Sequence, residues 1–439
     1  MPEKETIVVI GAGVIGLTTA LRIQETLHRN QTIQLIARDF PNTTSLNYAS
    51  PWAGAHYRPV PGSTPQALRE ETQAKQTYSY LKQLAKSDPS SGVAIIEGIE
   101  HLENPPSEYL DERSIKECYG HLDGFRILGK DECPEGVKWG ARYETAVINS
   151  PVYCAYLLRK FVLGGGVTRE YTVTDPREAF YLAPNVRTVV NCSALGFGDE
   201  RSFIIRGQTC LVRNPCSQTV TRQNSDGSWS FCIPRPLSGG TIIGGTKQPR
   251  DYDPNPSVET REKLLANAAK WFPFEPGSEG KFDVIRDIVG RRPAREGGMR
   301  IEVEKVGEGR FVVHAYGAGG RGFELSYGVA GDVVKLMVGN KLPRQSLFFL
   351  LFPDPLRLPA EGSQVEGIVV VTLLVAALIL GTPVTALKQC SSSGFLGLAG
   401  LFFGLLLVET LLLPLGECLR GDRCQVAREL VSFTFEPVL

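Results

Sequence analysis

The chain has 439 residues, which is more than one typical domain, so two or three structural units are expected. Hydrophobic residues make up 42% of it, enough for a large core, and the basic and acidic residues balance to a formal net charge of zero, which gives no reason to expect a nucleic-acid partner. The ten cysteines are scattered, without a C-x-x-C pair or a Cys/His cluster at metal-ligand spacing, so we expect reduced thiols and no metal site.

The first predicted elements are a strand, a glycine turn and a helix. Apolar β-branched residues fill most of 6–10, Gly-Ala-Gly-Val-Ile-Gly follows at 11–16, and an apolar pattern at helical spacing begins at residue 17. In such a motif Gly11 permits the turn, Gly13 lets the backbone approach a pyrophosphate, and Gly16 lets the helix pack against the strand. The helix N-terminus adds free N–H groups and a positive dipole end, so the motif predicts a dinucleotide site.

The next strand and loop extend this predicted site. The strand at 32–37 ends at Arg38-Asp39, about where a ribose-binding acidic group belongs. Residues 40–61 contain too many Pro, Ser, Asn and Gly for a regular element, and long loops inside compact domains are usually functional. We expect hydroxyl groups for the pyrophosphate and a small backbone surface for a flat ring, supplied by Thr43, Thr44, Ser45, Ala53 and Gly54. The alternative is a surface loop without a ligand.

The middle of the chain predicts helices and strands in alternation, followed by hairpins. Helices are expected at 66–87 and 151–163, and strands at 93–100, 146–148, 167–171 and 188–192, whereas 103–138 is polar and indicates little. The glycines after residue 192 form a second turn where backbone can meet a dinucleotide. Residues 203–246 have the pattern of hairpins, which favours a separate antiparallel sheet on the substrate side, and 258–272 predicts a helix.

Four arginines lie between residues 291 and 300. We interpret Arg291, Arg292 and Arg295 as solvated or as members of structural ion pairs. Arg300 differs because it begins an alternating strand, which can direct its guanidinium to one face of a sheet. A strand at 310–316, a glycine loop at 317–322 and a helix then repeat the cradle pattern of the N-terminus.

Several separated motifs together resemble the D-amino-acid oxidase family in a fungal style. They are Gly-Ala-Gly-Val-Ile-Gly-Leu at 11–17, Ala-Ser-Pro-Trp-Ala-Gly-Ala at 49–55, Arg-Gly-Gln-Thr at 206–209, Gly-Gly-Thr at 244–246, Arg-Arg-Pro-Ala-Arg-Glu-Gly-Gly-Met-Arg-Ile-Glu at 291–302 and His-Ala-Tyr-Gly-Ala-Gly-Gly-Arg-Gly at 314–322. The resemblance follows the family's order over about residues 5–340. It is therefore far more specific than any single motif.

The resemblance implies a mixed α/β fold and a flavin-dependent reaction. A Rossmann-like FAD-binding domain would be assembled from about 1–60, 140–195 and 305–341, and an antiparallel-sheet substrate domain from about 61–139 and 196–304. The cofactor would be FAD, and the small-molecule partners a D-amino acid and O2. A D-amino acid would become an imino acid, and then a 2-oxo acid and ammonia, while O2 becomes hydrogen peroxide.

The same resemblance implies roles for individual residues. Arg300 would be the catalytic residue that binds the substrate carboxylate with its planar fork, and the backbone acceptor for the substrate amine would lie near Gly320. No side-chain acid or base is required, because a hydride passes from the substrate Cα to flavin N5 and catalysis rests on alignment. The implied FAD contacts are Gly11, Ala12, Gly13, Val14, Ile15, Gly16, Arg38, Asp39, Thr43, Thr44, Ser45, Ala53, Gly54, Ser193, Gly319, Gly320, Gly322, Phe323 and Glu324.

Three residues depart from the family's pattern. Phe231 stands where a tyrosine hydroxyl often helps to hold the substrate carboxylate, and the loss of such a hydrogen bond costs about 0.5–1.5 kcal/mol. Ala194 replaces an expected glycine and would crowd the flavin loop. Lys247 stands where D-aspartate oxidases tend to carry arginine, so we expect it to pair with a second substrate carboxylate or to be a solvated surface lysine.

The composition changes abruptly after residue 341. Two apolar stretches, 367–387 and 395–415, each have the length of a membrane-spanning helix, although Glu409 is costly in the second. A membrane anchor and an incorrectly translated extension both remain open. The N-terminus lacks a signal-peptide pattern, so we expect an intracellular protein. The family resemblance implies the cytoplasm or the peroxisome, although the C-terminus shows no peroxisomal signal.

Four functions were weighed from the sequence, and D-amino-acid oxidase is the first. D-aspartate oxidase is the near alternative because of Lys247. A flavin-binding, membrane-tethered protein with impaired catalysis is another, motivated by Phe231, Ala194 and the tail. An NAD-dependent dehydrogenase fits the first glycine motif but explains no other one. Assembly as a homodimer is left open.

Overall fold

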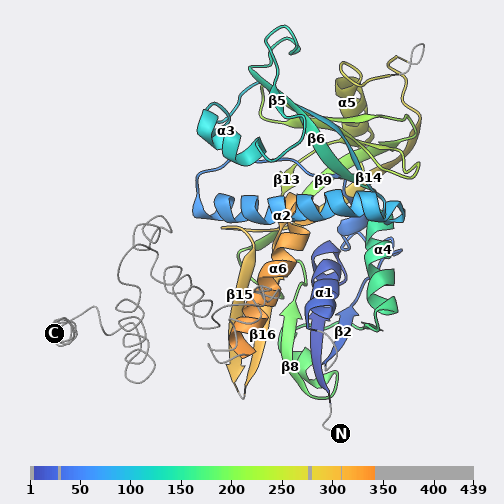
Figure 1. The fold of residues 1–439 in the computed structure, drawn as a ribbon. Helices are drawn as coiled ribbons and strands as arrows, with labels where there is room; N and C mark the ends of the chain where they lie inside the picture. Colours follow the sequence, from blue (N-terminus) through green and yellow to red (C-terminus); the bar gives the residue numbers. More distant parts are fainter. Residues whose placement is uncertain (1–3, 28–30, 275–278, 308, 342–439) are drawn as a thin grey trace, which may run out of the picture. The chain divides into compact units, whose positions relative to one another are not determined.

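The computed structural model describes residues 4–27, 31–274, 279–307 and 309–341. These residues form two β-sheets with helices packed against them (Figure 1). A long helix, α2 (Pro65–Ser87), crosses between the region of the first sheet and the region of the second (Figure 1). The mixed α/β architecture predicted from the sequence is confirmed.

The first sheet has six strands and carries the N-terminal motif. Its order is β15 (Arg300–Gly307), β16 (Arg310–Tyr316), β8 (Val186–Asn191), β1 (Glu5–Ile10), β2 (Gln31–Ala37) and β7 (Val167–Glu170). Every pairing is parallel except the β15–β16 hairpin. Helix α1 (Val14–Thr26) connects β1 to β2, as the strand, turn and helix pattern predicts.

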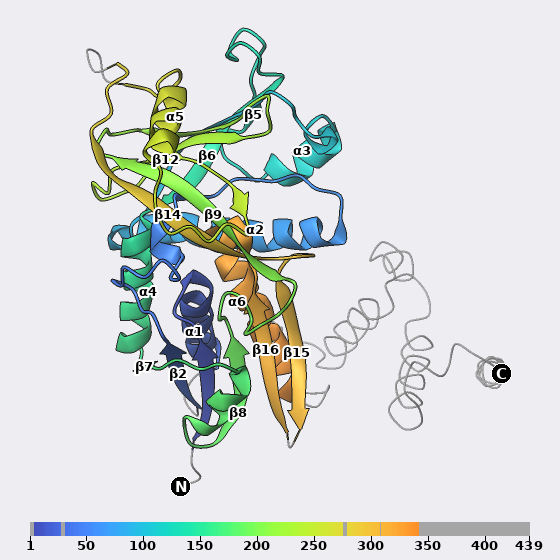
Figure 2. The ribbon, with the colours of Figure 1, turned by 180° about the vertical axis from the view of Figure 1, so that it is seen from behind.

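Both faces of this sheet are covered, which explains its nearly continuous apolar strands. On one face Val9 and Leu35 belong to a core shared with helices α1, α4 (Ser150–Leu163) and α6 (Gly322–Lys341). On the other face Val8 packs in a separate cluster with Phe180 of the short helix η4 (Pro176–Tyr181). Figure 2 shows the sheet from this second side.

The second sheet has ten strands and is mostly antiparallel. Its path runs β13 (Gln248–Pro249), β9 (Ser202–Val212), β12 (Thr241–Gly244), β11 (Trp229–Pro234), β10 (Gln218–Gln223), β4 (Val93–Leu102), β6 (Trp139–Ile148) and β3 (Ala55–His56). Strand β14 (Val284–Arg295) pairs with β9, and β5 (Arg126–Ile127) pairs with β6. The predicted hairpins at 203–246 correspond to β9 through β12.

Some elements differ from the sequence-based expectation. Helix α5 (Val258–Ala268) ends four residues before the predicted Phe272, and Phe272 packs into a core cluster with Cys210 and Cys232. Helix α3 (Glu112–Tyr119) lies in the segment that indicated little; Asp111 caps it by accepting a hydrogen bond from Ser114 N at 2.8 Å. Strand β6 lies in the ten-stranded sheet, although the expected FAD-binding segment begins near residue 140.

None of the helices among the described residues is long and apolar enough to span a membrane. The two stretches predicted as spans, 367–387 and 395–415, lie outside the described residues.

Candidate active site

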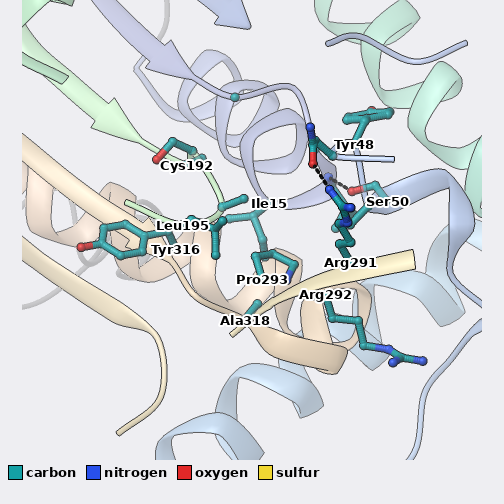
Figure 3. Close-up of a pocket in the computed structure, with 18 of the residues that line it drawn as sticks. Ile15, Tyr48, Ser50, Cys192, Leu195, Arg291, Arg292, Pro293, Tyr316 and Ala318 are labelled. Atoms are coloured by element: carbon teal, nitrogen blue, oxygen red, sulfur yellow. Dashed lines mark hydrogen bonds between the residues drawn. The ribbon is translucent and has the colours of Figure 1, made fainter. Parts of the chain in front are cut away.

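A cavity of about 530 Å³ lies where the two sheets approach each other. Its walls come from the carboxyl ends of β1, β2, β8 and β16 on one side and from β9, β11 and β14 on the other. The carboxyl ends of parallel strands are the usual place for ligands in such sheets, and the volume suits a small molecule or cofactor. Figure 3 shows the lining residues converging from both sides.

The N-terminal glycine turn forms one end of this cavity. Gly11 has a φ of +100°, and a Cβ atom built on it would lie 2.4 Å from the carbonyl oxygen of Cys192. A Cβ atom on Gly16 would lie 1.8 Å from the carbonyl oxygen of Gly11, so α1 packs directly on the turn. The roles expected for these two glycines are therefore visible in the backbone.

Two side chains that the sequence analysis did not single out support this turn. Ser50 Oγ accepts a hydrogen bond from Val14 N at 2.9 Å, at the N-terminus of α1. Tyr48 is buried and donates to the Ala12 carbonyl at 2.7 Å. Both residues line the cavity and lie in the middle of the polar loop that was expected to contact the cofactor. Their roles depend on how the loop folds back on α1, which the loop's composition does not reveal.

Most of the predicted cofactor residues line the cavity. Those that do are Gly11, Ala12, Gly13, Val14, Ile15, Gly16, Arg38, Asp39, Ala53, Gly54, Ser193, Gly319, Gly320, Gly322 and Phe323.

Thr43, Thr44, Ser45 and Glu324 are not among the lining residues. Thr43 Oγ1 accepts from Ser45 N at 3.2 Å, so this hydroxyl stabilises the loop itself. Glu324 pairs with Arg321 at 2.7 Å.

Arg300, the expected carboxylate-binding residue, does not line the cavity either. Its Nε donates to Glu302 at 2.7 Å and one terminal nitrogen donates to the Tyr316 hydroxyl at 3.3 Å. Tyr316 does line the cavity, and it donates to Asp199 at 2.8 Å. Arg300 therefore contacts the site only through Tyr316.

Like its neighbour Arg291, Arg292 lines the cavity from β14. One terminal nitrogen donates to the Thr246 carbonyl at 3.2 Å, and no carboxylate among the described residues pairs with it. Burial lowers the pKa of its guanidinium. A desolvated cation with so few partners is costly unless an anion joins it.

The position of Arg292 depends on the alternation of side chains along β14. Its neighbour Arg291 points the other way, as Figure 3 shows. Arg291 donates to Asn47 Oδ1 at 3.0 Å. Arg295, also expected to be structural, pairs with Asp199 at 2.7 Å. The expectation that Arg292 is solvated or ion-paired is not met among the described residues, because its guanidinium packs over Gly207 inside the molecule.

Phe231 and Gly320 lie near Arg292 in the cavity wall. The Phe231 ring packs against Gly244, where an added Cβ atom would come within 2.1 Å of it. A Cβ atom on Gly320 would lie 3.6 Å from Cδ of Arg292, so the Gly320 backbone lies beside the Arg292 side chain. These three residues form what we call the substrate wall.

The other two departures from the family pattern lie at different distances from the site. Ala194 lines the cavity with a φ of +74°, and its carbonyl accepts from Gly317 N at 3.1 Å. Lys247 is exposed and does not line the cavity.

Comparisons with known proteins agree with this geometry. The family model described as FAD dependent oxidoreductase matches residues 6–336. The chain is 45% identical over 360 residues to a D-aspartate oxidase from Talaromyces thermophilus, covering 78% of this chain and 96% of the relative. It is 32% identical over 344 residues to a D-amino-acid oxidase from Schizosaccharomyces pombe, covering 76% and 96%.

Solved structures support the fold. Glycine oxidase from Geobacillus kaustophilus superposes with a TM-score of 0.58 at 19% identity, covering 78% of this chain and 96% of that one. The glycine turn, the acidic end of β2 and the small residues at 53–54 together fit a dinucleotide with a flat ring. The chain belongs to the D-amino-acid oxidase family of FAD-dependent oxidoreductases, and its cofactor is FAD.

Proposed function

We propose that this enzyme oxidises D-amino acids to 2-oxo acids and ammonia, with O2 as the electron acceptor. The observation that carries the proposal is Arg292, a desolvated cation in the substrate wall without a carboxylate partner among the described residues. FAD, when bound, supplies the oxidation by accepting a hydride and passing the electrons to O2, which leaves as hydrogen peroxide.

Arg292 takes the role that the sequence analysis expected of Arg300. Its planar guanidinium can form two parallel hydrogen bonds with the substrate carboxylate, and the apolar surroundings strengthen them. The backbone of Gly320 lies beside it, so the Gly320 carbonyl can accept a hydrogen bond from the substrate amine. The two contacts hold the carboxylate and the amine on one side of the substrate and orient its Cα.

Phe231 contributes shape rather than a hydrogen bond. Its ring, with Trp52, makes the cavity wall apolar and helps to exclude water. Because Phe231 has no hydroxyl, Arg292 holds the substrate carboxylate without help from that position.

The described lining residues include one carboxylate, Asp39, and no histidine. Asp39 lies just after β2, at the end of the cavity proposed for the cofactor, and pairs with Arg38 at 2.7 Å. This composition favours oxidation by hydride transfer with an oriented substrate over a mechanism that needs a side-chain base.

A preference for acidic D-amino acids is the second candidate. The 45% identity with a D-aspartate oxidase favours it. Lys247, expected either to pair with the second carboxylate or to be a solvated surface lysine, is exposed and outside the cavity lining, so another group would have to provide the selectivity.

The test measures reduction of the bound flavin under anaerobic conditions by the loss of its visible absorption bands. D-aspartate and D-alanine are added separately, with L-aspartate as the stereochemical control. We expect bleaching with a D-amino acid and none with L-aspartate. The ratio of the D-aspartate and D-alanine rates decides between the two candidate substrate classes, and persistent flavin bands with both would contradict the proposed activity.

Two arginine variants test the assignment of the carboxylate site. Arg292→Leu should lower kcat/KM about 100-fold or more while flavin stays bound, because a charge-assisted pair in a desolvated site contributes about 2–5 kcal/mol. Arg300→Leu is the matched control and should change kcat/KM less than about fivefold, since its guanidinium is bound by Glu302 and Tyr316. The reverse order of effects would return the role to Arg300.

A further inference from the structure

Two thiols lie side by side behind the substrate wall. Cys216 and Cys232 have their sulfur atoms 3.8 Å apart. Cys216 stands in the connection between β9 and β10, and Cys232 lies within β11 directly after Phe231. Cys232 is fully buried, whereas Cys216 is partly exposed. The pair therefore has one thiol that solvent reaches and one that it does not.

The surroundings give the two thiols different reactivity. The hydrogen bond with Cys232 lowers the pKa of the Cys216 thiol, whereas burial raises the pKa of the Cys232 thiol. Cys216 also donates to the Gln218 carbonyl at 2.9 Å, which holds its sulfur beside that of Cys232. A partly exposed thiol with the greater thiolate fraction is the one that peroxides attack first.

We propose that Cys216 and Cys232 are a peroxide-reactive pair that closes to a disulfide. The Cys216 thiolate attacks one oxygen of hydrogen peroxide, the O–O bond breaks, and Cys216 becomes a sulfenic acid as hydroxide leaves. The Cys232 sulfur then attacks the sulfenic sulfur, the S–O bond breaks and water leaves. The two thiols lose two electrons in total, and one peroxide molecule is reduced to two molecules of water.

The source of the oxidant rests on the proposed function. Hydrogen peroxide would be produced in the cavity that Phe231 lines, one residue along β11 from Cys232. Alternation along the strand places Phe231 toward the cavity and Cys232 toward the core shared with Phe272 of the opposite face. The thiol pair therefore lies directly behind the wall that would face the substrate.

The other described cysteines provide internal controls. Cys118, Cys154, Cys192 and Cys210 are buried, and none of them has a thiol contact among the described residues. Cys133 is partly exposed like Cys216, but burial and nearby carboxylates raise the pKa of its thiol. Exposure alone would make Cys133 as reactive as Cys216, whereas the proposal predicts a clear difference.

The test treats the reduced, flavin-loaded full-length chain with hydrogen peroxide in the absence of any amino acid. Free thiols are then alkylated, and the unreduced protein is digested with trypsin and measured by mass spectrometry. The expected product is a disulfide between peptides 214–222 and 223–247. Retention of both thiols while Cys133 is oxidised would overturn the proposal, and so would an indiscriminate mixture of disulfides.

Variants separate the two steps. Cys232→Ser should stop the reaction at the sulfenic acid, so dimedone labels Cys216, and Cys216→Ser should prevent the disulfide. Cys133→Ser is the matched control and should form the disulfide at the wild-type rate. Dimedone labelling of Cys133 in preference to Cys216 would count against the assignment.

A parallel sample replaces added peroxide with a D-amino acid and O2, with and without catalase. A disulfide that forms with added peroxide but not during turnover would still support the proposed reactivity of the thiol pair. It would contradict the proposed oxidase activity instead.

Discussion

The two sides of the cavity use different parts of the chain to make a site. The six-stranded sheet presents backbone: Gly11 and Gly16 are required because a Cβ atom on either would overlap a carbonyl oxygen. The ten-stranded region presents side chains: Phe231 from β11 and Arg292 from β14. A backbone site needs a local run of residues, whereas a side-chain site needs distant strands in the correct register. The first kind can be recognised in a sequence far more directly than the second.

The largest expected effect is on the backbone side. Gly16→Ala should prevent flavin binding and lower the free energy of unfolding by about 3 kcal/mol, because the added Cβ atom would lie 1.8 Å from the Gly11 carbonyl oxygen. Flavin absorbance after gel filtration and urea unfolding measure the two effects.

Gly331→Ala is the matched control for this change. Gly331 lies within α6 and has open space around its Cβ position, so the substitution should stabilise the helix by up to about 1 kcal/mol. Equal behaviour of the two variants would contradict the close-packing argument for Gly16.

The next effect concerns how the two sides are joined. Arg235, on the ten-stranded side, is buried and donates to the carbonyls of Pro51 and Ala53 at 3.1 and 2.7 Å. Burial, and secondarily Arg286, lowers its pKa to about 10, so it remains charged at neutral pH. Arg235→Met should raise the flavin dissociation constant about tenfold, since hydrogen bonds from a charged group contribute about 1.5–3 kcal/mol.

Arg213→Met is the control for Arg235. Arg213 is exposed and pairs with the exposed Asp283 at 2.9 Å, so its loss should leave flavin affinity unchanged within about twofold. Flavin affinity is measured by fluorescence quenching on titration of the apoprotein. Tight flavin binding by Arg235→Met would show that the loop at 51–53 holds its shape without this cation.

The predictions from sequence agree with the structure more closely on the backbone side of the cavity than on the side-chain side. The strand, turn and helix at 6–26 were predicted because each step depends on neighbouring residues. Neighbouring residues do not reveal whether Arg292 or Arg300 lines the cavity. In the structure β14 pairs Arg292 with Ile205, whereas β15 pairs Arg300 with Tyr316 in the other sheet. Residues eight positions apart in the chain thus belong to different sheets, and only long-range pairing decides which one reaches the cavity.

In the polar loop at 40–61, on the cofactor side of the cavity, the sequence also did not show which side chains contact the glycine turn. Its composition indicated a ligand-binding loop, but it suggested the hydroxyls at 43–45 rather than Ser50. The loop closes on itself when Trp52 Nε1 donates to the Ser45 carbonyl at 3.1 Å, and this brings Ser50 to the N-terminus of α1. The selection of one hydroxyl among several depends on that fold of the loop.

A smaller effect is expected at Ala194, where a side chain occupies a position that favours glycine. Its φ of +74° costs a non-glycine residue about 1–2 kcal/mol. Ala194→Gly should raise the free energy of unfolding by about 0.5–1 kcal/mol. This is less than the strain it relieves, because the greater freedom of glycine stabilises the unfolded chain. Ala266→Gly, at an exposed position within α5, should have the opposite sign, with a loss of about 1 kcal/mol. A loss of stability in both variants would mean that the Ala194 backbone carries no such strain.

The smallest effect is expected at Lys247. The sequence left it open as a partner of a second substrate carboxylate or a solvated lysine, and in the structure it is exposed and outside the cavity lining. A solvated ammonium interacts with a carboxylate by only about 1 kcal/mol even at 4 Å, and salt screens it further with distance. Lys247→Ala should therefore change kcat/KM for D-aspartate and D-alanine equally, by less than about twofold. Steady-state kinetics at low and at physiological ionic strength measure this, with Arg292→Leu as the variant that must lose both substrates. A selective loss of D-aspartate oxidation that disappears at high salt would assign Lys247 to the second carboxylate after all, and would extend the substrate wall beyond the cavity lining.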